Sequence, residues 1–440
     1  MPQVCTHKSV IVSVMYIKSI EIKNIRAIRH FKMTFDKPAG WHVLIGDNGA
    51  GKSSIIRSLA LMLVGPDEIS GIKPNWNNWL QWKAEEGSIQ VSIVNLNATE
   101  TAASNAPFND EFKAALKWRR LEDNYVELEQ KAAKKSPVKN TLWGGRTEGF
   151  SAGYGPFRRF TGGSSEMDRV FENPRFSRLA AHLSLFGEDV ALTEATKWMM
   201  NLKFQTLEKK VKHDVLEDLK KLINSEDFLP HGTQLLSVGS DGVIFIDGNG
   251  AEISVTQMSD GYRSILSLTF EMIRQLIRVF GDDRVFNKVR NGEMFIDLPG
   301  VVLIDEVDAH LHPTWQTRIG DWFIKYFPNI QFIVTSHSPL ICRASEHGSI
   351  WRLTSPGSML KSEEITGNDK NKLIFGNVLD AYGTEVFGKS ITISKNGNEK
   401  RNRLGELNIK SIMGEAMPAQ EQKELNELKE IFPTEKTKLK

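Results

Sequence analysis

The sequence predicts an α/β protein whose central sheet takes strands from two distant parts of the chain. Three short strand patterns lie in the first 50 residues, a continuous apolar strand lies at 301–304, and a further strand pattern lies at 331–334. A glycine-rich loop at 46–51 joins the third strand pattern to a helix pattern, an order typical of phosphate-binding α/β units. These strands can share one sheet only if the residues between them are an insertion, so we expect a split domain with a helical lid in its middle.

Each element is predicted from the period of its apolar residues and from the turn residues around it. In chain order the expected strands are Ile17–Ile22, Phe31–Phe35, Trp41–Ile45, Ser88–Leu96, Gly149–Phe160, Val301–Ile304 and Gln331–Val334, with a hairpin around Gly248–Gly250. The expected helices are Lys52–Gly65, most of 175–223, Ser264–Phe280 and Thr314–Tyr326. Residues 97–145 are polar and are expected to form helix and mobile loop. Apolar residues at 204, 207, 211, 215, 219 and 222 predict one amphipathic helix.

This order of elements divides the chain into five regions. Residues 1–14 are expected to be a loose extension, with Met15 as an alternative start. The other four regions are a first lobe at 15–96, a mostly helical insertion or lid at 97–235, a second lobe at 236–355 and a mainly helical C-terminal region at 356–440. Because the helices of 375–432 have apolar faces and no chemistry, we expect them to form part of a partner-docking surface.

The composition is that of an ordinary soluble protein. Of the 440 residues, 40% are apolar and 25% charged, and the formal net charge of +2 gives no overall attraction to nucleic acid. The two cysteines, Cys5 and Cys342, exclude a disulfide framework or a zinc ribbon and fit a reducing cytoplasm. No apolar run approaches the roughly 20 residues of a membrane span, so no membrane partner is expected.

The stretch "GDNGAGKSS" has the spacing of a phosphate loop (Walker A), with Gly46, Gly51, Lys52 and Ser53 at its fixed positions. Its glycines let backbone N–H groups wrap phosphate oxygens, and the helix after the loop presents its positive end. Lys52 is expected to neutralise the β- and γ-phosphates of ATP, and Ser53 to bind Mg²⁺. The remaining expected nucleotide contacts in this loop are Asn48, Gly49 and Ser54.

A second stretch, "VVLIDEVDAHLHP", is an apolar strand that ends in two carboxylates. Such a strand is typical of a buried parallel sheet, and ligands bind at the carboxyl ends of such strands. We expect Asp305 to hold Mg²⁺ through water and Glu306 to polarise the attacking water. The next strand ends in "VTSHSP", which places His337 at the same edge, where it can touch the γ-phosphate.

A third stretch, "SVTQMSDGYRSILSL", places a small polar turn before an apolar helix. Together with the phosphate loop and the carboxylate strand, its order resembles the ABC-type ATPases of the SMC and RecF kind, in which this position carries the LSGGQ signature loop. The resemblance implies that Ser259 and Gly261 bind the γ-phosphate of ATP held by the opposite subunit. It also implies that Asp308, in the D-loop, crosses the dimer interface. The sequence departs from the family at Asp260 and Tyr262, and an ordinary capped helix is the alternative.

Four weaker signals each allow two interpretations. Arg26 resembles the N-terminal arginine that touches nucleotide in SMC-like heads, or it is a solvated surface arginine. The turn at 154–159 contacts nucleotide or Mg²⁺, or it is structural. Trp76, Trp79 and Trp82 stack bases or pack under the lid. The lysine cluster, Lys131, Lys134 and Lys135, binds DNA or forms a solvated face.

Several classes of ABC-like ATPase carry motifs of this kind. A transporter motor has a shorter insertion, and an SMC protein needs far more heptads than this chain offers. An overcoming-lysogenization-type nuclease needs a metal-binding Asp-x-Asp pair, which the tail of about 100 residues after Pro339 lacks, so no nuclease site is expected in this chain. The pattern, including "PNIQFIVTSHSPLICRAS" and "LIFGNVLDAYGTEVFG", most resembles the Septu (PtuA) ATPase family of bacterial antiviral defence and its retron-associated relatives.

That resemblance implies a function for the whole chain. The expected protein is a slowly hydrolysing ATP switch that forms an ATP-bridged dimer, or a larger homo-oligomer, and controls a separate HNH nuclease. A retron reverse transcriptase or nucleic acid is a further expected partner. The competing class is a RecF- or SMC-like repair ATPase that binds DNA directly, and salt-dependent binding to DNA ends would favour it.

Overall fold

The computed structural model describes residues 13–97, 110–129, 142–143, 149–156, 173–187, 194–208, 213–240, 242–354, 357, 362–377, 381, 395–414 and 416–432. The chain divides into two compact units, Met1–Phe375 and Gly376–Lys440, and each is described by itself. Residues 1–12, the lysine cluster at 131–135 and the end of the 154–159 turn lie outside the described residues. No described helix is long and apolar enough to cross a membrane.

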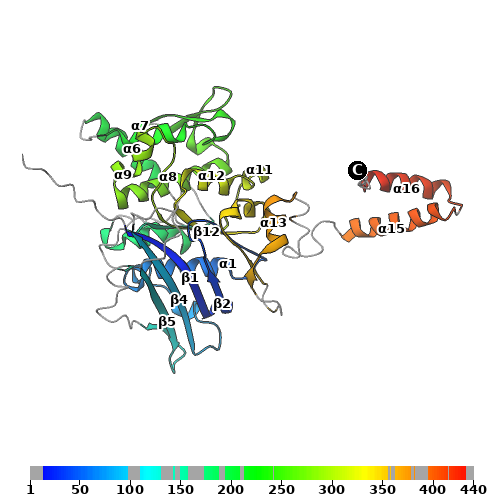
Figure 1. The fold of residues 1–440 in the computed structure, drawn as a ribbon, viewed down its shortest axis with the longest axis horizontal. Coiled ribbons are helices and arrows are strands. Elements are labelled where there is room, and N and C mark those ends of the chain that lie inside the picture. The colour runs from blue at the N-terminus through cyan, green and yellow to red at the C-terminus, as the bar shows by residue number, and fades with distance from the viewer. Residues whose placement is uncertain are drawn as a thin grey trace, which may run out of the picture. The chain divides into compact units, whose positions relative to one another are not determined.

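The first unit is built around a mixed six-stranded sheet (Figure 1). Its order is β14 (Glu363–Glu364), β13 (Ile350–Leu353), β3 (Gly40–Gly46), β12 (Ile330–Ser336), β11 (Gly300–Ile304) and β7 (Ser151–Tyr154). All neighbours pair in parallel except β14, which is antiparallel to β13. Every residue of β11 and β12 is buried, which is why β11 is continuously apolar and β12 has an apolar centre at 332–334.

A second, antiparallel sheet lies beside the first and shares its core. Its order is β2 (Ile28–Thr34), β1 (Ser13–Ile25), β4 (Glu86–Asn97), β5 (Asp110–Arg120) and β6 (Val126–Glu129). Helix α1 (Lys52–Val64) contacts strands of both sheets, and one apolar core contains residues of both sheets and the buried side of α1. The phosphate loop is therefore followed by a helix that is packed into the core of both sheets.

The prediction of helix and loop for 97–145 is wrong for the described part of that region, which forms β5 and β6. The alternation that identifies β5 is visible in hindsight: Ala114, Leu116 and Trp118 are buried, and the residues between them are exposed. A period of two is a strand signal, but the many charged residues of the outer face concealed it. The insertion also supplies β7, an edge strand of the main sheet, so it is not only a helical lid.

Helices and a small third sheet make up most of the remaining insertion and the chain immediately after it (Figure 1). The helices are α5 (Ser177–His182), α6 (Glu194–Leu207), α7 (Val215–Ile223), α8 (Asp260–Phe280), α9 (Asp282–Val285) and α10 (Asn287–Arg290), and α2 (Pro66–Ile69) follows α1 in the first lobe. The sheet is a meander of β8 (Gln234–Gly239), β9 (Gly242–Ile246) and β10 (Glu252–Ser254). Short 3₁₀ turns lie at Ser70–Ile72, Trp76–Asn78, Pro174–Phe176, Leu183–Leu185, Pro230–Gly232 and Val255–Gln257.

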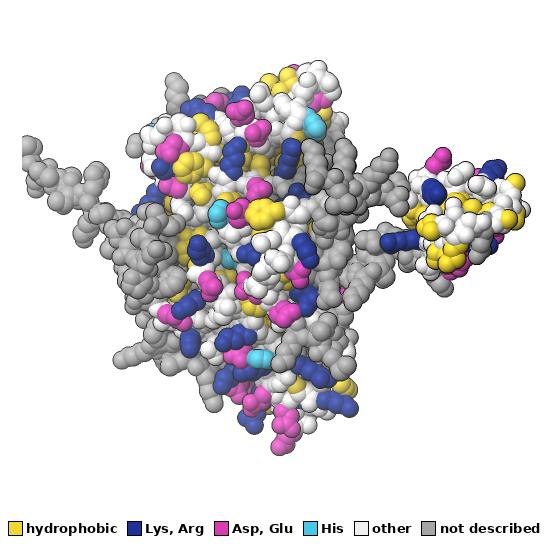
Figure 2. Space-filling view, turned by 45° about the vertical axis from the view of Figure 1, so that its right-hand side comes forward, with side chains coloured by type: hydrophobic (Ala, Val, Ile, Leu, Met, Phe, Trp, Pro, Cys, Tyr) yellow, Lys and Arg dark blue, Asp and Glu magenta, His cyan; other side chains and the backbone are white. Residues whose placement is uncertain are grey.

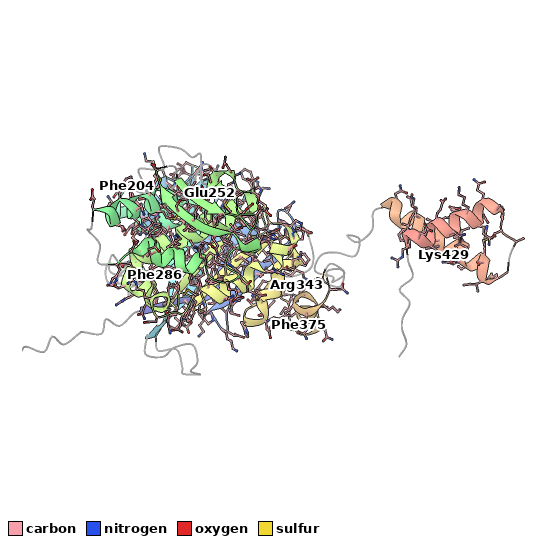
Figure 3. The ribbon with its side chains drawn as sticks, turned by 90° about the horizontal axis from the view of Figure 1, so that it is seen from above. Phe204, Glu252, Phe286, Arg343, Phe375 and Lys429 are labelled. Atoms are coloured by element: carbon pink, nitrogen blue, oxygen red, sulfur yellow. The ribbon has the colours of Figure 1, made fainter. Side chains whose placement is uncertain are left out.

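The single amphipathic helix predicted from the stripe at 204–222 is two helices. Asp214 ends the continuity: its carboxylate accepts hydrogen bonds from the N–H groups of Leu216 and Glu217 and caps α7. Phe204 near the end of α6 is 55% exposed instead of belonging to a shared apolar face (Figure 3). The stripe position at 211 lies outside the described residues.

The predicted helix at 314–326 is also divided, into α11 (Pro313–Gln316) and α12 (Ile319–Tyr326). Gly320 lets α12 approach β3, because a Cβ at this position would lie 2.4 Å from Ala344 and 2.9 Å from the ring of Trp41. A 3₁₀ segment (Pro339–His347) and α13 (Gly367–Phe375) complete this side of the unit. On the face that Figure 2 displays, acidic and basic side chains are interspersed, as the net charge of +2 suggests.

The second unit is a helical hairpin of α15 (Lys395–Ile412) and α16 (Ala419–Ile431). Its small core consists of Leu404, Leu407, Leu425 and Leu428. Arg403 pairs with Glu424, and Lys410 with Glu421, across the two helices. The hairpin is thus the helical C-terminal region that the sequence predicts, and its role as a docking surface stays a prediction.

Candidate nucleotide site

Three adjacent parallel strands bring the predicted catalytic residues to one edge of the main sheet. In the order β3, β12, β11, the phosphate loop follows the first strand, His337 the second and Asp305 the third. The registers align the ends, because Ser336 lies opposite Ile45 and Ile304 opposite Val334. Residues separated by some 250 positions in sequence therefore meet at the carboxyl edge, where α/β sheets bind ligands.

The phosphate loop has the backbone that its glycines predict. Gly46, Gly49 and Gly51 all have positive φ, at 156°, 79° and 95°. Gly51 precedes α1 in a left-handed conformation and no side chain caps the helix. The first N–H groups of α1 are therefore the kind of orphan donors that bind an anion. Ser53 and Ser54 stand in this first turn, as the motif requires.

Lys52 is held in place by its own loop. Its side chain is buried, and Nζ donates hydrogen bonds to the carbonyl oxygens of Gly46 at 2.7 Å and Asp47 at 3.0 Å. Nζ also lies 3.4 Å from Nδ1 of His337, so the structure brings the lysine and the histidine together. Burial lowers the pKa of Lys52, and the charges of Asp305, Glu306 and other nearby carboxylates oppose that effect.

Asp305 is fixed by Thr335, which lies in the "VTSHSP" stretch but is not among the predicted site residues. The carboxylate is 2% exposed, and its Oδ1 accepts a 2.6 Å hydrogen bond from the hydroxyl of Thr335 on β12. The same hydroxyl accepts a 2.8 Å bond from the N–H of Glu306. The available signal was a polar residue directly after the apolar centre of the strand, since a buried polar side chain needs a partner.

The strand ends sharply after Asp305. The N–H of Asp305 still pairs with the carbonyl of Tyr154, but Glu306 has a φ of 49°. A left-handed backbone costs a non-glycine residue about 1–2 kcal/mol, and such strain is found at functional sites. The turn breaks the strand's alternation immediately after Asp305, in keeping with the prediction that the two carboxylates have different tasks.

The D-loop comes directly after this turn and packs against the signature turn of the same chain. Oδ1 of Asp308 is buried and has no hydrogen-bond partner. His310 has a φ of 65°, and its carbonyl oxygen would lie 3.0 Å from a Cβ at position 261. Glycine at 261 therefore allows the close approach of these two turns.

The predicted signature turn contains the N-cap of α8. Ser259 is the N-cap residue of α8, yet its hydroxyl makes no capping hydrogen bond. The helix begins at Asp260, four residues before the predicted start at Ser264. Asp260 forms an ion pair with Arg263, which offsets the unfavourable charge expected beside a phosphate.

Ser259 and Gly261 open into a groove of about 1290 Å³. The opposite walls of the groove come from 224–234 and from 310–325. Of the described residues that line this groove, none belongs to the phosphate loop of the same chain. The signature turn and the phosphate loop of the chain thus face different spaces.

Arg26 and two of the three predicted tryptophans form one packed group. The guanidinium of Arg26 lies 4.5 Å above the ring of Trp79, which in turn stacks on Trp118. Trp76 packs on both rings edge to face, so packing is the correct interpretation for Trp76 and Trp79. Trp82 is 83% exposed and belongs to no such group. Arg26 is half-buried and is not a solvated surface arginine; its contact with nucleotide stays a prediction.

The oxygen ligands at this edge suit Mg²⁺. Asp305 after β11 and the hydroxyl of Ser53 in the first turn of α1 are hard oxygen donors, and Mg²⁺ prefers one or two such groups together with phosphates and water. Among the described residues no group of three or more His, Cys, Asp and Glu side chains forms a complete metal site. A divalent cation here would therefore depend on the phosphates of a nucleotide.

The fold and these motifs define an α/β nucleotide-binding ATPase of the P-loop class. The chain belongs to the family described as "AAA domain, putative AbiEii toxin, Type IV TA system", which matches residues 42–343. That match includes the phosphate loop, the signature turn, both strand-end carboxylates and His337.

The curated relatives carry Septu and retron names. "Septu protein PtuA" of Bacillus mycoides is 26% identical over 343 residues, which are 76% of this chain and 40% of that protein. "Retron Vc95 probable ATPase" of Vibrio cholerae is 24% identical over a match that covers 68% of this chain and 66% of that protein. The "Septu protein PtuA" of Bacillus thuringiensis is 25% identical over a match that covers 75% of this chain and 74% of that protein. The chain thus spans less than two thirds of the Bacillus mycoides protein.

Solved structures with a similar course of the chain include SMC and RecF proteins. An SMC head domain of Pyrococcus furiosus, bound to the C-terminal domain of ScpA, is 14% identical with a TM-score of 0.43, over 80% of this chain and 96% of that one. The RecF–ATP structure is 14% identical with a TM-score of 0.37, over 80% of this chain and all of that one. At these TM-scores the likeness is distant.

Proposed function

We propose that this protein binds and hydrolyses ATP as a nucleotide-dependent switch in defence against phage. The observation that supports it most is the meeting of Lys52, His337 and Asp305 at the ends of β3, β12 and β11. The names of the Septu and retron relatives support the biological setting.

In this proposal each residue at the edge has one task. The N–H groups of the loop and Lys52 bind the β- and γ-phosphates, and they neutralise charge that develops during transfer. Glu306 polarises the attacking water, and His337 contacts the γ-phosphate. Mg²⁺, held by Ser53 and through water by Asp305, would supply further neutralisation of phosphate charge.

The site is proposed to be completed by a second copy of the chain. Ser259 has an uncommitted hydroxyl at a helix N-terminus, in a groove that the chain's own phosphate loop does not line. A γ-phosphate presented by another subunit fits this chemistry. ATP would then join two subunits, with Gly261 and the D-loop residue Asp308 at their interface.

The output of the switch is proposed to be a separate HNH nuclease. Binding of ATP would restrain or license that nuclease, and a retron reverse transcriptase or nucleic acid is a further proposed partner. Affinity purification of the full chain from its native host tests this part, with the product of the adjacent gene as the expected companion. Salt-dependent binding of the pure chain to DNA ends, without such a companion, would favour the repair class instead.

The variant Glu306→Gln tests the switch most directly. It should bind ATP like the wild type, hydrolyse it at least about 100-fold more slowly, and accumulate ATP-bridged dimers. Light scattering after gel filtration, with and without ATP, measures the dimer. The matched control is Glu293→Gln, an exposed carboxylate on a surface ion pair with Lys288. Normal hydrolysis by the Glu306→Gln protein would refute the assignment of the base.

A further inference from the structure

The outer face of α15 carries a stripe of uncharged residues that the rest of the hairpin leaves exposed. Asn402, Gly405, Ile409 and Ile412 make up this stripe, and their spacing is that of positions a and d in a heptad repeat. The side chain of Ile409 is 56% exposed and that of Ile412 is 85% exposed. Hydrophobic side chains are accordingly visible on the surface of the hairpin in Figure 2. These four residues are called the seam below.

The seam faces away from the core of the hairpin. With 3.6 residues per turn, its centre lies about 150° around the helix from Leu404 and Leu407, which belong to the core shared with α16. A Cβ added at Gly405 would have no neighbouring atom within 4 Å, so the backbone is open there to an approaching surface. Glycine inside a helix lowers its stability relative to alanine, and the close approach of another backbone is a physical reason for keeping it.

The hairpin by itself buries little apolar surface. Its core has four leucines, with Met417 and Phe432 packed against it and only partly buried. A core of this size rarely stabilises a small unit, and association with another chain is a common remedy. The other helix offers little for such a contact, because the exposed surface of α16 includes the charged residues Lys423, Glu427 and Glu430. The seam on α15 is therefore the better candidate for burial.

The charges beside the seam favour a second copy of α15 as its cover. Arg401 and Glu406 are exposed on opposite sides of the seam, at the g and e positions of the repeat. In a parallel pair in register, Arg401 of each copy lies beside Glu406 of the other, which gives two attractive contacts by symmetry. An antiparallel pair would bring the two Glu406 side chains together. Arg403 and Lys410 do not oppose association, because each pairs with a glutamate of α16.

We propose that α15 pairs in parallel with α15 of a second copy of this chain, in a contact between subunits that needs no nucleotide. Ile409 and Ile412 of both copies form its apolar layers, and Gly405 lets the two backbones approach. The two Asn402 side chains hydrogen-bond to each other and set the register. This contact goes beyond the proposed ATP-bridged dimer, because it lies on the other unit of the chain and forms when no ATP is bound. The seam is short, so the pairing is weak and reversible.

The test uses the full chain with Lys52→Ala and no added nucleotide, so that ATP does not bridge two copies. Analytical ultracentrifugation over a wide range of protein concentrations should show a monomer–dimer equilibrium. Ile409→Asp should raise the dissociation constant of that dimer about 100-fold or more, because it brings two carboxylates into the seam. Ile431→Asp is the matched control. It makes the same change at a residue of α16 that is 55% exposed, and it should leave the constant within about twofold.

A charge exchange and a cross-link test the partner and its orientation. Arg401→Glu and Glu406→Arg should each weaken the dimer about threefold or more, and the double variant should restore it. Gly405→Cys, combined with Cys5→Ser, should form a disulfide between two copies under mild oxidation, because parallel pairing in register places the two 405 positions side by side. Gln422→Cys, exposed on α16, is the control and should not cross-link.

Several results would overturn the proposal. The chain could stay monomeric at every concentration, or Ile409→Asp and Ile431→Asp could act alike. Gly405→Cys could fail to cross-link, or the double charge variant could associate no better than the single ones. Ile409→Asp could also release a copurified partner protein and leave self-association unchanged, and the seam would then dock that partner instead. Failure of the ATP-bridged dimer would appear separately, as no further association when ATP is added to the wild-type protein.

Discussion

The phosphate-loop edge and the signature groove are both suited to phosphate, but one is closed and the other open. At the edge, Lys52 is bonded to its own loop and Asp305 to Thr335, so the residues are held before any ligand arrives. At the groove, the hydroxyl of Ser259 makes no capping bond, and the space beside it measures about 1290 Å³. The comparison supports the proposal that one chain holds the nucleotide by itself and that closure of the site needs a second copy.

The largest effect is expected from Lys52→Ala at the closed edge. Loss of a buried cation that contacts phosphate should weaken ATP binding by about 100-fold or more. Titration with a fluorescent ATP analogue measures this, with Lys32→Ala on the exposed side of β2 as control. Unchanged affinity would mean that the edge does not bind the triphosphate.

The second-largest effect distinguishes the signature groove from the phosphate-loop edge. Ser259→Arg should leave ATP affinity within about twofold but lower the steady-state ATPase rate about tenfold or more, because the bulky cation blocks closure. Binding and hydrolysis are measured on the same preparation. The control is Ser240→Arg at the exposed turn after β8. A parallel loss of affinity would show that the groove belongs to the same chain's site.

A smaller effect is expected from Thr335→Val, which keeps the volume and removes the hydroxyl that links Asp305 to Glu306. The ATPase rate should fall about tenfold, and more Mg²⁺ should be needed for half-maximal rate, since outer ligands orient metal ligands. Thr269→Val is the matched control: its hydroxyl is buried on α8 and donates only to the carbonyl of Ile265. Equal effects of the two variants would assign Thr335 a purely structural role.

The smallest effect is expected from two buried histidines of the first unit, His42 and His182. Burial lowers the pKa of His42 on β3 and of His182 on α5 to about 4, below the ordinary value of 6.5. The unfolded chain therefore gains protons before the folded one as the pH falls from 6.5 to 4. Over that window each histidine should remove up to about 1.4 kcal/mol of stability per pH unit, with no such loss above pH 6.5.

Denaturant unfolding at pH 7, 6 and 5 measures this loss. His42→Gln should flatten the dependence, while His30→Gln at an exposed position should not. A free energy of unfolding that is constant from pH 7 to 5 would contradict the expected protonation. It would not affect the comparison of the two phosphate-binding regions.

Most strands of the main sheet, and most residues at its proposed nucleotide-binding edge, could be predicted from the sequence for physical reasons. Strands β3, β11 and β12 are buried on both faces and so are mainly apolar at their centres, and the phosphate loop has fixed glycine positions. Strand β5 was missed because one face is charged, and the break before α7 because Asp214 lies within an apolar period. Thr335 was missed because its partner Asp305 lies 30 positions away, and only strand order shows that they touch.

Strand β7 has a consequence for engineering this chain. It lies inside the segment between the phosphate loop and the carboxylates, yet it extends the main sheet, and the carbonyl of Tyr154 holds the N–H of Asp305. Removing that segment as a separate module would take the edge strand from the main sheet and leave the N–H of Asp305 without its hydrogen-bond acceptor at the proposed nucleotide site. Any shortened version must keep 149–156, and splice points belong on either side of it.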